Sequence, residues 1–480
     1  MACYNYLQPD ATAILNIAHD PDMHCAAAEQ DARIIIRRLC SGHDVPLHSA
    51  ATVRLKLLNC ACRELDAAGL GLEKMTRLRR MTLYSCPNLV RLPNSICKLK
   101  TLAVLDLSGC TGLEELPRHL ELLGALQSLD LRDCVKLKGL PGRLSGLQSL
   151  TKLNLSGCTE LQELPEEIGC LSSLRVLLLA GCESLTSFPD SICNLGSLTR
   201  LVLHGCANLR CLPEMIGDLT ACETLLLTDC HGIRELPIKI RSLSSLHVLS
   251  MKGCMHLKAL PKDMGMGMNK LRTLDFAGCS SLTNLCPSIV ELWSLRVLDL
   301  QRCFSLESLP EVFGADLQPV VEVISLKGCR NLRNLPESVC DLKALNELDL
   351  SGCSRLEQLP RKFEGLSCNL RTLRLADCEV MKELPRSICQ FKSLVALDLE
   401  GCYRLMEEYQ PARLYREFND DYQLQSMLES YMGKLLMNAF ARAELLTHDV
   451  ERIKRRRQYF VGVCPPSLEE GYPQNVPFRF

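Results

Sequence analysis

Fifteen cysteines recur at nearly constant spacing, and this periodicity constrains the fold more than any other feature of the chain. Ten of the fourteen gaps between successive members are 24 residues long, and the others are 25 or 26. A fixed period in this range predicts stacked repeats, each of which buries its apolar side against its neighbours. Such a chain builds an extended surface rather than a catalytic pocket. The series is Cys60, Cys86, Cys110, Cys134, Cys158, Cys182, Cys206, Cys230, Cys254, Cys279, Cys303, Cys329, Cys353, Cys378 and Cys402.

Each period repeats one apolar pattern, L-x-x-L-x-L-x-x-C-x-x-L-x-x-L-P-x-x-I-x-x-L-x-x, as in residues 150–173. The alternation of Leu153 and Leu155 predicts a short strand with both side chains inward. A proline ends the descending limb in most repeats, because it cannot extend a strand ladder. The apolar residues three apart after it suit one turn of α- or 3₁₀-helix. Strands should therefore line one face and helical turns the wider, convex face.

Three longer repeats place their extra residues consistently. The additions fall near residues 264–270, 313–321 and 364–369, always after the proline. We therefore expect them on the convex limb, where loops tolerate added length and ladder strands do not.

The repeat wording LDLSGCxxLxxLPxSIxxLxSL resembles the leucine-rich-repeat family. It is most similar to the repeat region of plant intracellular nucleotide-binding leucine-rich-repeat immune receptors. The resemblance covers about residues 51–405 and implies an α/β solenoid of about fifteen repeats, with a parallel concave sheet and helical caps. The chain has no G-x-x-x-x-G-K-[ST] phosphate loop, so the nucleotide switch of those receptors is not implied.

The sequence divides into four predicted parts. Residues 1–50 form an N-terminal helical cap, with a helix over residues 22–40 that covers the open core of the first repeat. Residues 51–405 form the solenoid, and residues 406–460 form a C-terminal helical segment. Residues 461–480 are a tail rich in proline and aromatic residues, which we expect to be extended. The C-terminal helix and tail could dock a partner. The basic run at residues 452–457 is open to two interpretations: nuclear targeting or anion contact, and a helix C-terminus favoured by the dipole.

The charge balance, the apolar runs and the cysteine content of the chain indicate which partners and which cellular compartment to expect. The 55 basic and 56 acidic residues nearly cancel, so no nucleic-acid partner is expected. No uninterrupted apolar run is long enough for a membrane span. The start of the chain lacks the pattern of a signal peptide, and its 29 cysteines would stay reduced in an intracellular compartment. We expect a cytoplasmic protein, with a nuclear or cytoskeletal location still open.

The cysteine series has a structural and a chemical interpretation. Cysteine is small and commonly buried, and its S–H group is a weak donor for a loop carbonyl, so we expect a buried ladder. Cys60 and Cys62 lack a second pair with zinc spacing, and we expect neither a metal nor a cofactor. A second set occupies partly buried positions of the convex limb: Cys97, Cys193, Cys340 and Cys389.

The residue between the last two strand leucines should point to the concave face. In three consecutive repeats this residue is apolar, and neighbouring strands lie about 4.8 Å apart. An apolar patch rimmed by polar groups is typical of a partner site, although isolated surface leucines are common. We expect the patch to hold Val176, Leu178, Val202 and Leu226, with Arg200 and His204 on its rim.

The same row carries two acidic pairs, Asp106 with Asp130 and Asp275 with Asp299. Like charges on neighbouring strands cost stability, so a basic segment of a partner could offset them. Ordinary solvated acids are the alternative, and a carboxylate pair supplies too few ligands for calcium.

These observations predict a non-enzymatic module for protein–protein interaction, a recognition or signalling adaptor that binds a protein partner on its concave face. The resemblance adds a role in defence. A structural subunit of a large cytoskeletal or ciliary assembly is the alternative, favoured by the long C-terminal segment. A ubiquitin ligase with appended repeats is a minor alternative, for which Cys464 is the only cysteine after the solenoid.

Overall fold

The computed structural model describes residues 75–313, 320–385 and 393–408, together with residues 54–58, 63, 72, 387, 388 and 391 and the backbone of residues 14–17. The predicted cap helix over residues 22–40, the extended tail and almost all of the C-terminal helical segment lie outside the described residues. Cys60, Cys62 and Cys389 also lie outside them.

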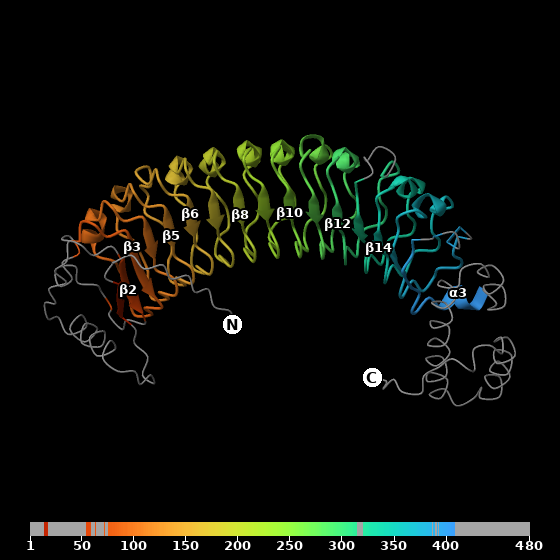
Figure 1. Ribbon diagram of the computed structural model, residues 1–480, viewed down its shortest axis with the longest axis horizontal. Coiled ribbons are helices and arrows are strands. Elements are labelled where there is room, and N and C mark those ends of the chain that lie inside the picture. The colour runs from red at the N-terminus through yellow and green to blue at the C-terminus, as the bar shows by residue number, and fades with distance from the viewer. Residues whose placement is uncertain are drawn as a thin grey trace, which may run out of the picture.

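Sixteen short strands in the described part of the chain form one parallel sheet in chain order, which curves along the inner side of an arc (Figure 1). The predicted leucine-rich-repeat solenoid with a parallel concave sheet is confirmed. The first strand, β1, lies among residues 1–50, where no strand was expected. The strands are β1 (Ile14–Ile17), β2 (Arg54–Leu58), β3 (Arg80–Tyr84), β4 (Val104–Asp106), β5 (Ser128–Asp130), β6 (Lys152–Asn154), β7 (Val176–Leu178), β8 (Arg200–Val202), β9 (Thr224–Leu226), β10 (Val248–Ser250), β11 (Thr273–Asp275), β12 (Val297–Asp299), β13 (Val323–Ser325), β14 (Glu347–Asp349), β15 (Thr372–Arg374) and β16 (Ala396–Asp398).

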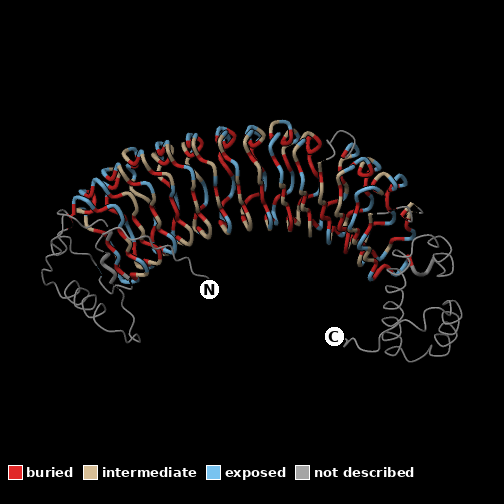
Figure 2. The backbone as a smooth tube through the Cα atoms, in the orientation of Figure 1, coloured by how far each residue is buried: buried red, intermediate tan, exposed pale blue. Residues whose placement is uncertain are grey.

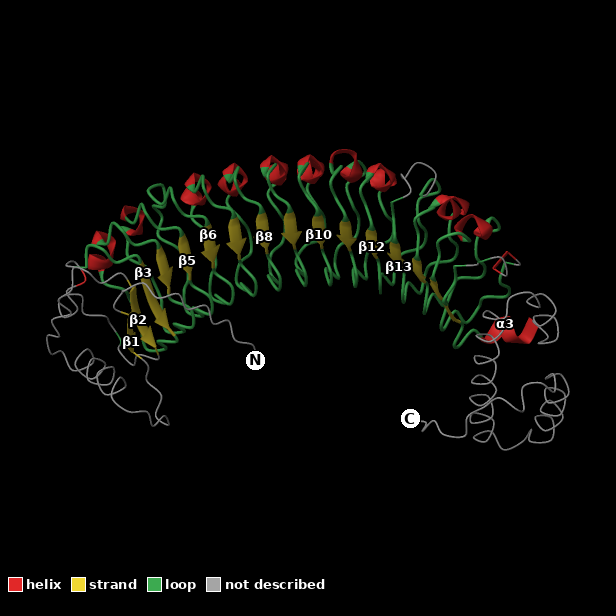
Figure 3. Cartoon of the chain, viewed as in Figure 1, coloured by secondary structure: helices red, strands yellow, loops and turns green. Residues whose placement is uncertain are grey.

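Short 3₁₀-helices line the outer, convex side of the arc (Figure 3). The proline acts as their N-cap in most repeats, as Pro93 does before η2, and its carbonyl accepts the N–H of Ile96 at 3.1 Å. The helices are η2 (Asn94–Lys98), η3 (Leu120–Leu122), η4 (Glu166–Cys170), η5 (Asp190–Asn194), η6 (Glu214–Asp218), η7 (Ile238–Ser242), η8 (Met264–Gly267), η9 (Pro287–Glu291), η10 (Glu337–Asp341) and η11 (Phe363–Leu366). One short α-helix, α3 (Tyr403–Glu408), follows the last strand.

Two of the three insertions lie where the pattern predicted them. The additions near residues 264–270 and 364–369 fall on the convex limb around η8 and η11, whereas residues 314–319 lie outside the described part. The strands on either side of these insertions keep their register, since β10 pairs with β11 and β14 with β15. Added length is thus absorbed away from the concave face.

The core runs along the inside of every coil (Figure 2). In the repeat that contains β6, the inward leucines Leu153 and Leu155 and the ladder cysteine Cys158 are at most 1% exposed. Ile168 of η4 is equally buried and closes the same coil from the convex side. Because the inward strand residues fill this interior, the outward strand residues are the ones on the concave face that can differ and carry specificity.

Candidate functional site

Strand alternation sorts the concave residues into rows. The middle residue of each three-residue strand points into the core, and the first and third point outward. On β8, Leu201 is fully buried, whereas Arg200 is exposed and Val202 half-buried. The first and third strand positions therefore form two parallel rows along the concave face, and the predicted site residues occupy them.

The apolar row predicted from the sequence is continuous across β7, β8 and β9. Leu178 lies beside Val202 and Val202 beside Leu226 in the parallel register. These three side chains and Val176 are half-buried, since neighbouring strands cover their flanks. We call these four residues the apolar patch. That it binds a partner remains a prediction.

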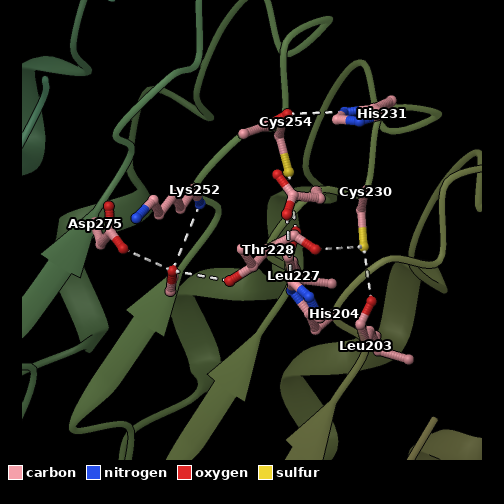
Figure 4. Close-up of polar contacts among 12 residues, drawn as sticks. Leu203, His204, Leu227, Thr228, Cys230, His231, Lys252, Cys254 and Asp275 are labelled. Atoms are coloured by element: carbon pink, nitrogen blue, oxygen red, sulfur yellow. Dashed lines mark hydrogen bonds and ion pairs between the residues drawn. The ribbon is translucent and has the colours of Figure 1, made fainter. Parts of the chain in front are cut away.

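Polar groups border the apolar patch, and Figure 4 shows the contacts around two of them, His204 and Thr228. Arg200, the first residue of β8, and His204, two residues after its end, are exposed, as expected for a rim. His204 Nδ1 lies 3.8 Å from the carboxylate of Asp229 in the next coil. Thr228 Oγ1 lies 3.4 Å from Ser250 Oγ, within hydrogen-bonding distance. The rim therefore combines a fixed hydroxyl pair with charged groups in contact with solvent.

Ser250 at the end of β10 links the apolar patch to the acidic residues beyond it. This serine is only 7% exposed, and its hydroxyl donates to Asp275 Oδ2 at 2.8 Å. The hydroxyl also accepts the backbone N–H of Lys252 at 3.4 Å. This polar connection between β10 and β11 was missing from the sequence analysis, because the pattern identifies neighbouring positions but not hydroxyl directions.

Both acidic pairs are true neighbours in the sheet. In each of the four aspartates, Oδ1 accepts the backbone N–H two residues later, at 2.9–3.1 Å. This local bond closes the turn that leaves the strand. Asn154 makes the same bond to Ser156, and Asp349 makes it to Ser351. The acidic residues thus have a structural role in their own repeats. Sequence reasoning missed this role, although the recurring D-L-S-G-C motif indicates it.

Each of the four aspartates also accepts a side-chain donor: Asp275 accepts the hydroxyl of Ser250 at 2.8 Å, and Asp299 accepts the side-chain amide of Gln301 at 3.3 Å. Asp106 also accepts the hydroxyl of Ser108 at 2.6 Å, and Asp130 accepts the amide of Asn154 at 3.1 Å. Burial raises the pKa of Asp299. The hydrogen bond from the Gln301 N–H lowers this pKa, and the neighbouring charge of Asp275 raises it again. Burial and the neighbouring carboxylate therefore oppose the negative charge of Asp299.

The cysteine series is a hydrogen-bonded ladder inside the coil. From Cys110 to Cys402, each thiol lies 2.9–3.3 Å from a backbone carbonyl oxygen of the preceding repeat and donates to it. Cys158, for example, donates to Leu131 at 3.2 Å. Burial raises the pKa of the Cys158 thiol to about 12. These thiols therefore serve the fold, because a thiolate in this position would be desolvated and could not donate.

The second cysteine set is also buried. Cys97, Cys193 and Cys340 on the convex limb are 3–5% exposed, and burial raises the pKa of Cys97 and Cys193 to about 11. All cysteines in the described ranges are free thiols. Within the same ranges, no group of three or more His, Cys, Asp or Glu side chains is placed to hold a metal ion.

We expect Cys158→Ala to lower the free energy of unfolding by about 1–2 kcal/mol. The substitution removes a buried group and leaves the Leu131 carbonyl without its donor. Urea denaturation followed by circular dichroism measures the change. Cys170→Ala, at an exposed cysteine, is the matched control and should shift stability by less than about 0.5 kcal/mol. Equal midpoints for the two variants would contradict a structural ladder.

A left-handed backbone position precedes every ladder cysteine from Cys86 to Cys402. The residues there have φ between 54° and 78°, and most are glycine. Glycine suits this conformation because it has no Cβ, and aspartate is among the side chains that tolerate it. The signal was present in the recurring G-C and D-C dipeptides, but the sequence analysis did not use it. This turn directs the chain from the strand to the descending limb.

Comparisons with known proteins agree with the geometry. A family model described as Zer-1-like leucine-rich repeats matches residues 337–417, and the Leucine Rich Repeat model matches residues 149–171. TMV resistance protein N of Nicotiana glutinosa is 37% identical over 65 residues, which are 14% of this chain and 6% of that protein. The chain thus spans a small part of the curated relative that it matches.

Among solved structures, a leucine-rich-repeat protein of Leptospira interrogans has a TM-score of 0.53 and 23% identity. The alignment covers 77% of this chain and 89% of that protein, which shows a shared fold. In the described part of the chain, no helix has the length and apolar character needed to cross a membrane. The protein is a leucine-rich-repeat solenoid, and its repeats resemble those of plant intracellular nucleotide-binding leucine-rich-repeat receptors.

Proposed function

We propose that this chain is a non-enzymatic protein-interaction module that binds a protein partner on its concave face. The observation that carries the proposal is the continuous row of Leu178, Val202 and Leu226 on three adjacent strands. Half-buried apolar side chains at the centre of a polar rim are the usual anatomy of a protein interface. Arg200 and His204 supply exposed charge and hydrogen-bonding groups at that rim.

The rigidity of the surface supports the same function. Each outward side chain of the patch stands on a strand whose middle residue is locked in the core, as Leu177, Leu201 and Leu225 are. A partner therefore meets a surface that is already ordered, and it loses little of its binding free energy to ordering that surface. A preformed surface of this kind suits the binding of a protein partner.

Within this class we favour a recognition or signalling adaptor with a role in defence. The short match to TMV resistance protein N supports it, although it spans 6% of that protein. We place the adaptor in the cytoplasm, because the ladder thiols act as donors only while they are reduced. The structural-subunit and ligase alternatives depend on residues 406–480, nearly all of which lie outside the described residues.

The test is a double substitution, Leu178→Asp with Leu226→Asp. It places carboxylates at both ends of the apolar row, and we expect partner recovery to fall at least about tenfold, because apolar contact is lost and charge is buried. The measurement is quantitative affinity purification with mass spectrometry, using the full chain as bait in cells.

Leu122→Asp is the matched control. Leu122 of η3 is 48% exposed on the convex side, so the same chemical change is made on the opposite face. Recovery should match that of the wild type. Partner recovery that survives the double substitution, with circular dichroism showing an intact fold, would exclude the apolar patch as the binding site.

A further inference from the structure

The row of third strand positions that holds Leu178, Val202 and Leu226 continues along the concave face as a row of polar residues. The third positions of β11 to β14 are Asp275, Asp299, Ser325 and Asp349, and each is the direct register neighbour of the next. Three carboxylates and one hydroxyl therefore stand side by side on four adjacent strands.

The charge of this row is unbalanced at β11 and β12. No lysine, arginine or histidine nitrogen in the described residues lies within 4.0 Å of the Asp275 or Asp299 carboxylate. Burial and the charge of Asp275 each raise the pKa of Asp299 by more than the nearby charge of Lys252 lowers it. A cation that approached these two carboxylates would remove this repulsion.

Ser325 independently indicates that a hydrogen-bonding group is missing from this row. This residue is only 8% exposed, yet its hydroxyl has no hydrogen-bond partner among the described residues. Ile324, the middle residue of β13, points into the core at 1% exposure, so Ser325 points outward into the acidic row. Buried hydroxyls are normally satisfied, and this one lies between Asp299 and Asp349 where a donor or acceptor is missing.

The chain itself shows how a guanidinium fits this row. Arg374 of β15 forms an ion pair with Glu347, and its Nη1 lies 3.9 Å from Asp349 Oδ2. At the β14 end of the row the chain thus provides its own cation. Asp275 and Asp299, at the other end, have no cationic nitrogen within the same distance in the part of the chain that the structure describes.

We infer that Asp275, Asp299 and Ser325 form a subsite for one cationic side chain, arginine or lysine, of the protein partner. The inference rests on the proposed function, because the subsite lies on the same concave face as the apolar patch. Carboxylates accept charge-assisted hydrogen bonds from a guanidinium or ammonium group, and a serine oxygen adds a further acceptor. A metal ion fits less well, since the described residues hold no group of three ligands around it.

The spacing of the two sites defines the partner further. Val202 on β8 and Asp299 on β12 are four strand steps apart, roughly 19 Å at about 4.8 Å per step. An extended peptide that crosses the strands advances about 3.3 Å per residue. The partner therefore carries a bulky apolar residue and a basic residue about six positions apart in an extended segment.

A displayed library of random peptides, selected on the full chain, tests this inference. We expect enriched peptides to combine an apolar residue with arginine or lysine at about that spacing. The affinity of these peptides for the double variant Asp275→Asn, Asp299→Asn should be about tenfold lower than for the wild type. This difference in affinity should shrink at high salt. Asparagine is a safe replacement, because Asn154 occupies the same row and makes the same turn bond. Ser325→Ala should weaken binding about threefold without lowering the midpoint of thermal unfolding, since its hydroxyl has no partner to lose.

The second acidic pair supplies the matched control. Asp106→Asn with Asp130→Asn makes the same chemical change at β4 and β5, and it should leave peptide affinity unchanged. Peptides that lose affinity for Leu178→Asp with Leu226→Asp but not for the Asp275/Asp299 variant would overturn the subsite and leave the proposed function standing. Equal losses at both acidic pairs would overturn the subsite as nonspecific charge attraction. Failure to enrich any sequence would count against the subsite and the proposed function together.

Discussion

Leu201→Ala is expected to lower the free energy of unfolding by about 2–5 kcal/mol, the largest effect that we anticipate. Leu201 is the middle residue of β8, and it is fully buried between Leu177 of β7 and Leu225 of β9. Truncation removes its apolar contacts and leaves a cavity that the two flanking coils cannot fill, because each is fixed by its own ladder.

Urea denaturation followed by circular dichroism measures this loss. Leu122→Ala is the control, since Leu122 is 48% exposed on η3 and its truncation should change stability by no more than about 0.5 kcal/mol. Because repeats interact mainly with their neighbours, hydrogen exchange should show the greatest loss of protection in β7, β8 and β9. Uniform loss along the whole solenoid would contradict this nearest-neighbour description.

Gly205→Val is expected to cost about 2–3 kcal/mol, for a reason that concerns the backbone rather than the core. Gly205 precedes the ladder residue Cys206 and has a φ of 73°, which β-branched side chains strongly disfavour. A Cβ at this position would lie 3.6 Å from the backbone of Gly181, an ordinary contact. The expected cost therefore comes from the dihedral angle and not from lack of space.

Gly205→Asn separates these two causes. Asp229 and Asp133 occupy the equivalent position in other repeats with φ of 57° and 59°, so a short polar side chain tolerates this turn. We expect asparagine to cost less than about 1 kcal/mol in the same urea titration. If valine and asparagine reduced stability equally, the left-handed turn would not be the cause.

Much of the fold could be predicted because the repeat constrains it many times over. The inward leucines, the proline before each 3₁₀-helix and the buried ladder cysteine each recur in most coils, so one correct register extends to its neighbours. Leu178, Val202 and Leu226 were aligned from the sequence for that reason, and the structure has them in the same register. The strand β1 was not anticipated, because residues 14–17 lack the repeat motif.

The details of the candidate site depended on contacts that spacing does not encode. The hydrogen bond from Ser250 to Asp275 joins residues 25 positions apart, and the absence of a partner for Ser325 is known only once all its neighbours are placed. The sequence left open whether a basic segment of a partner offsets the acidic pairs or whether they are ordinary solvated acids. The structure shows that a backbone N–H and a side-chain donor satisfy part of each carboxylate, and that burial raises the pKa of Asp299.

The sequence by itself determined the repeat length, the strand register and the identity of the residues on the concave face, because side-chain direction in a strand alternates with position. Only the tertiary structure decided which of those residues are satisfied within the chain. Hydrogen bonds and ion pairs depend on distances of a few ångströms between coils, and a periodic sequence specifies neighbours without specifying those distances. Asp299 and Asp130 occupy the same repeat position, yet their surroundings differ. Burial raises the pKa of Asp299, whereas Asp130 accepts a hydrogen bond from the Asn154 amide.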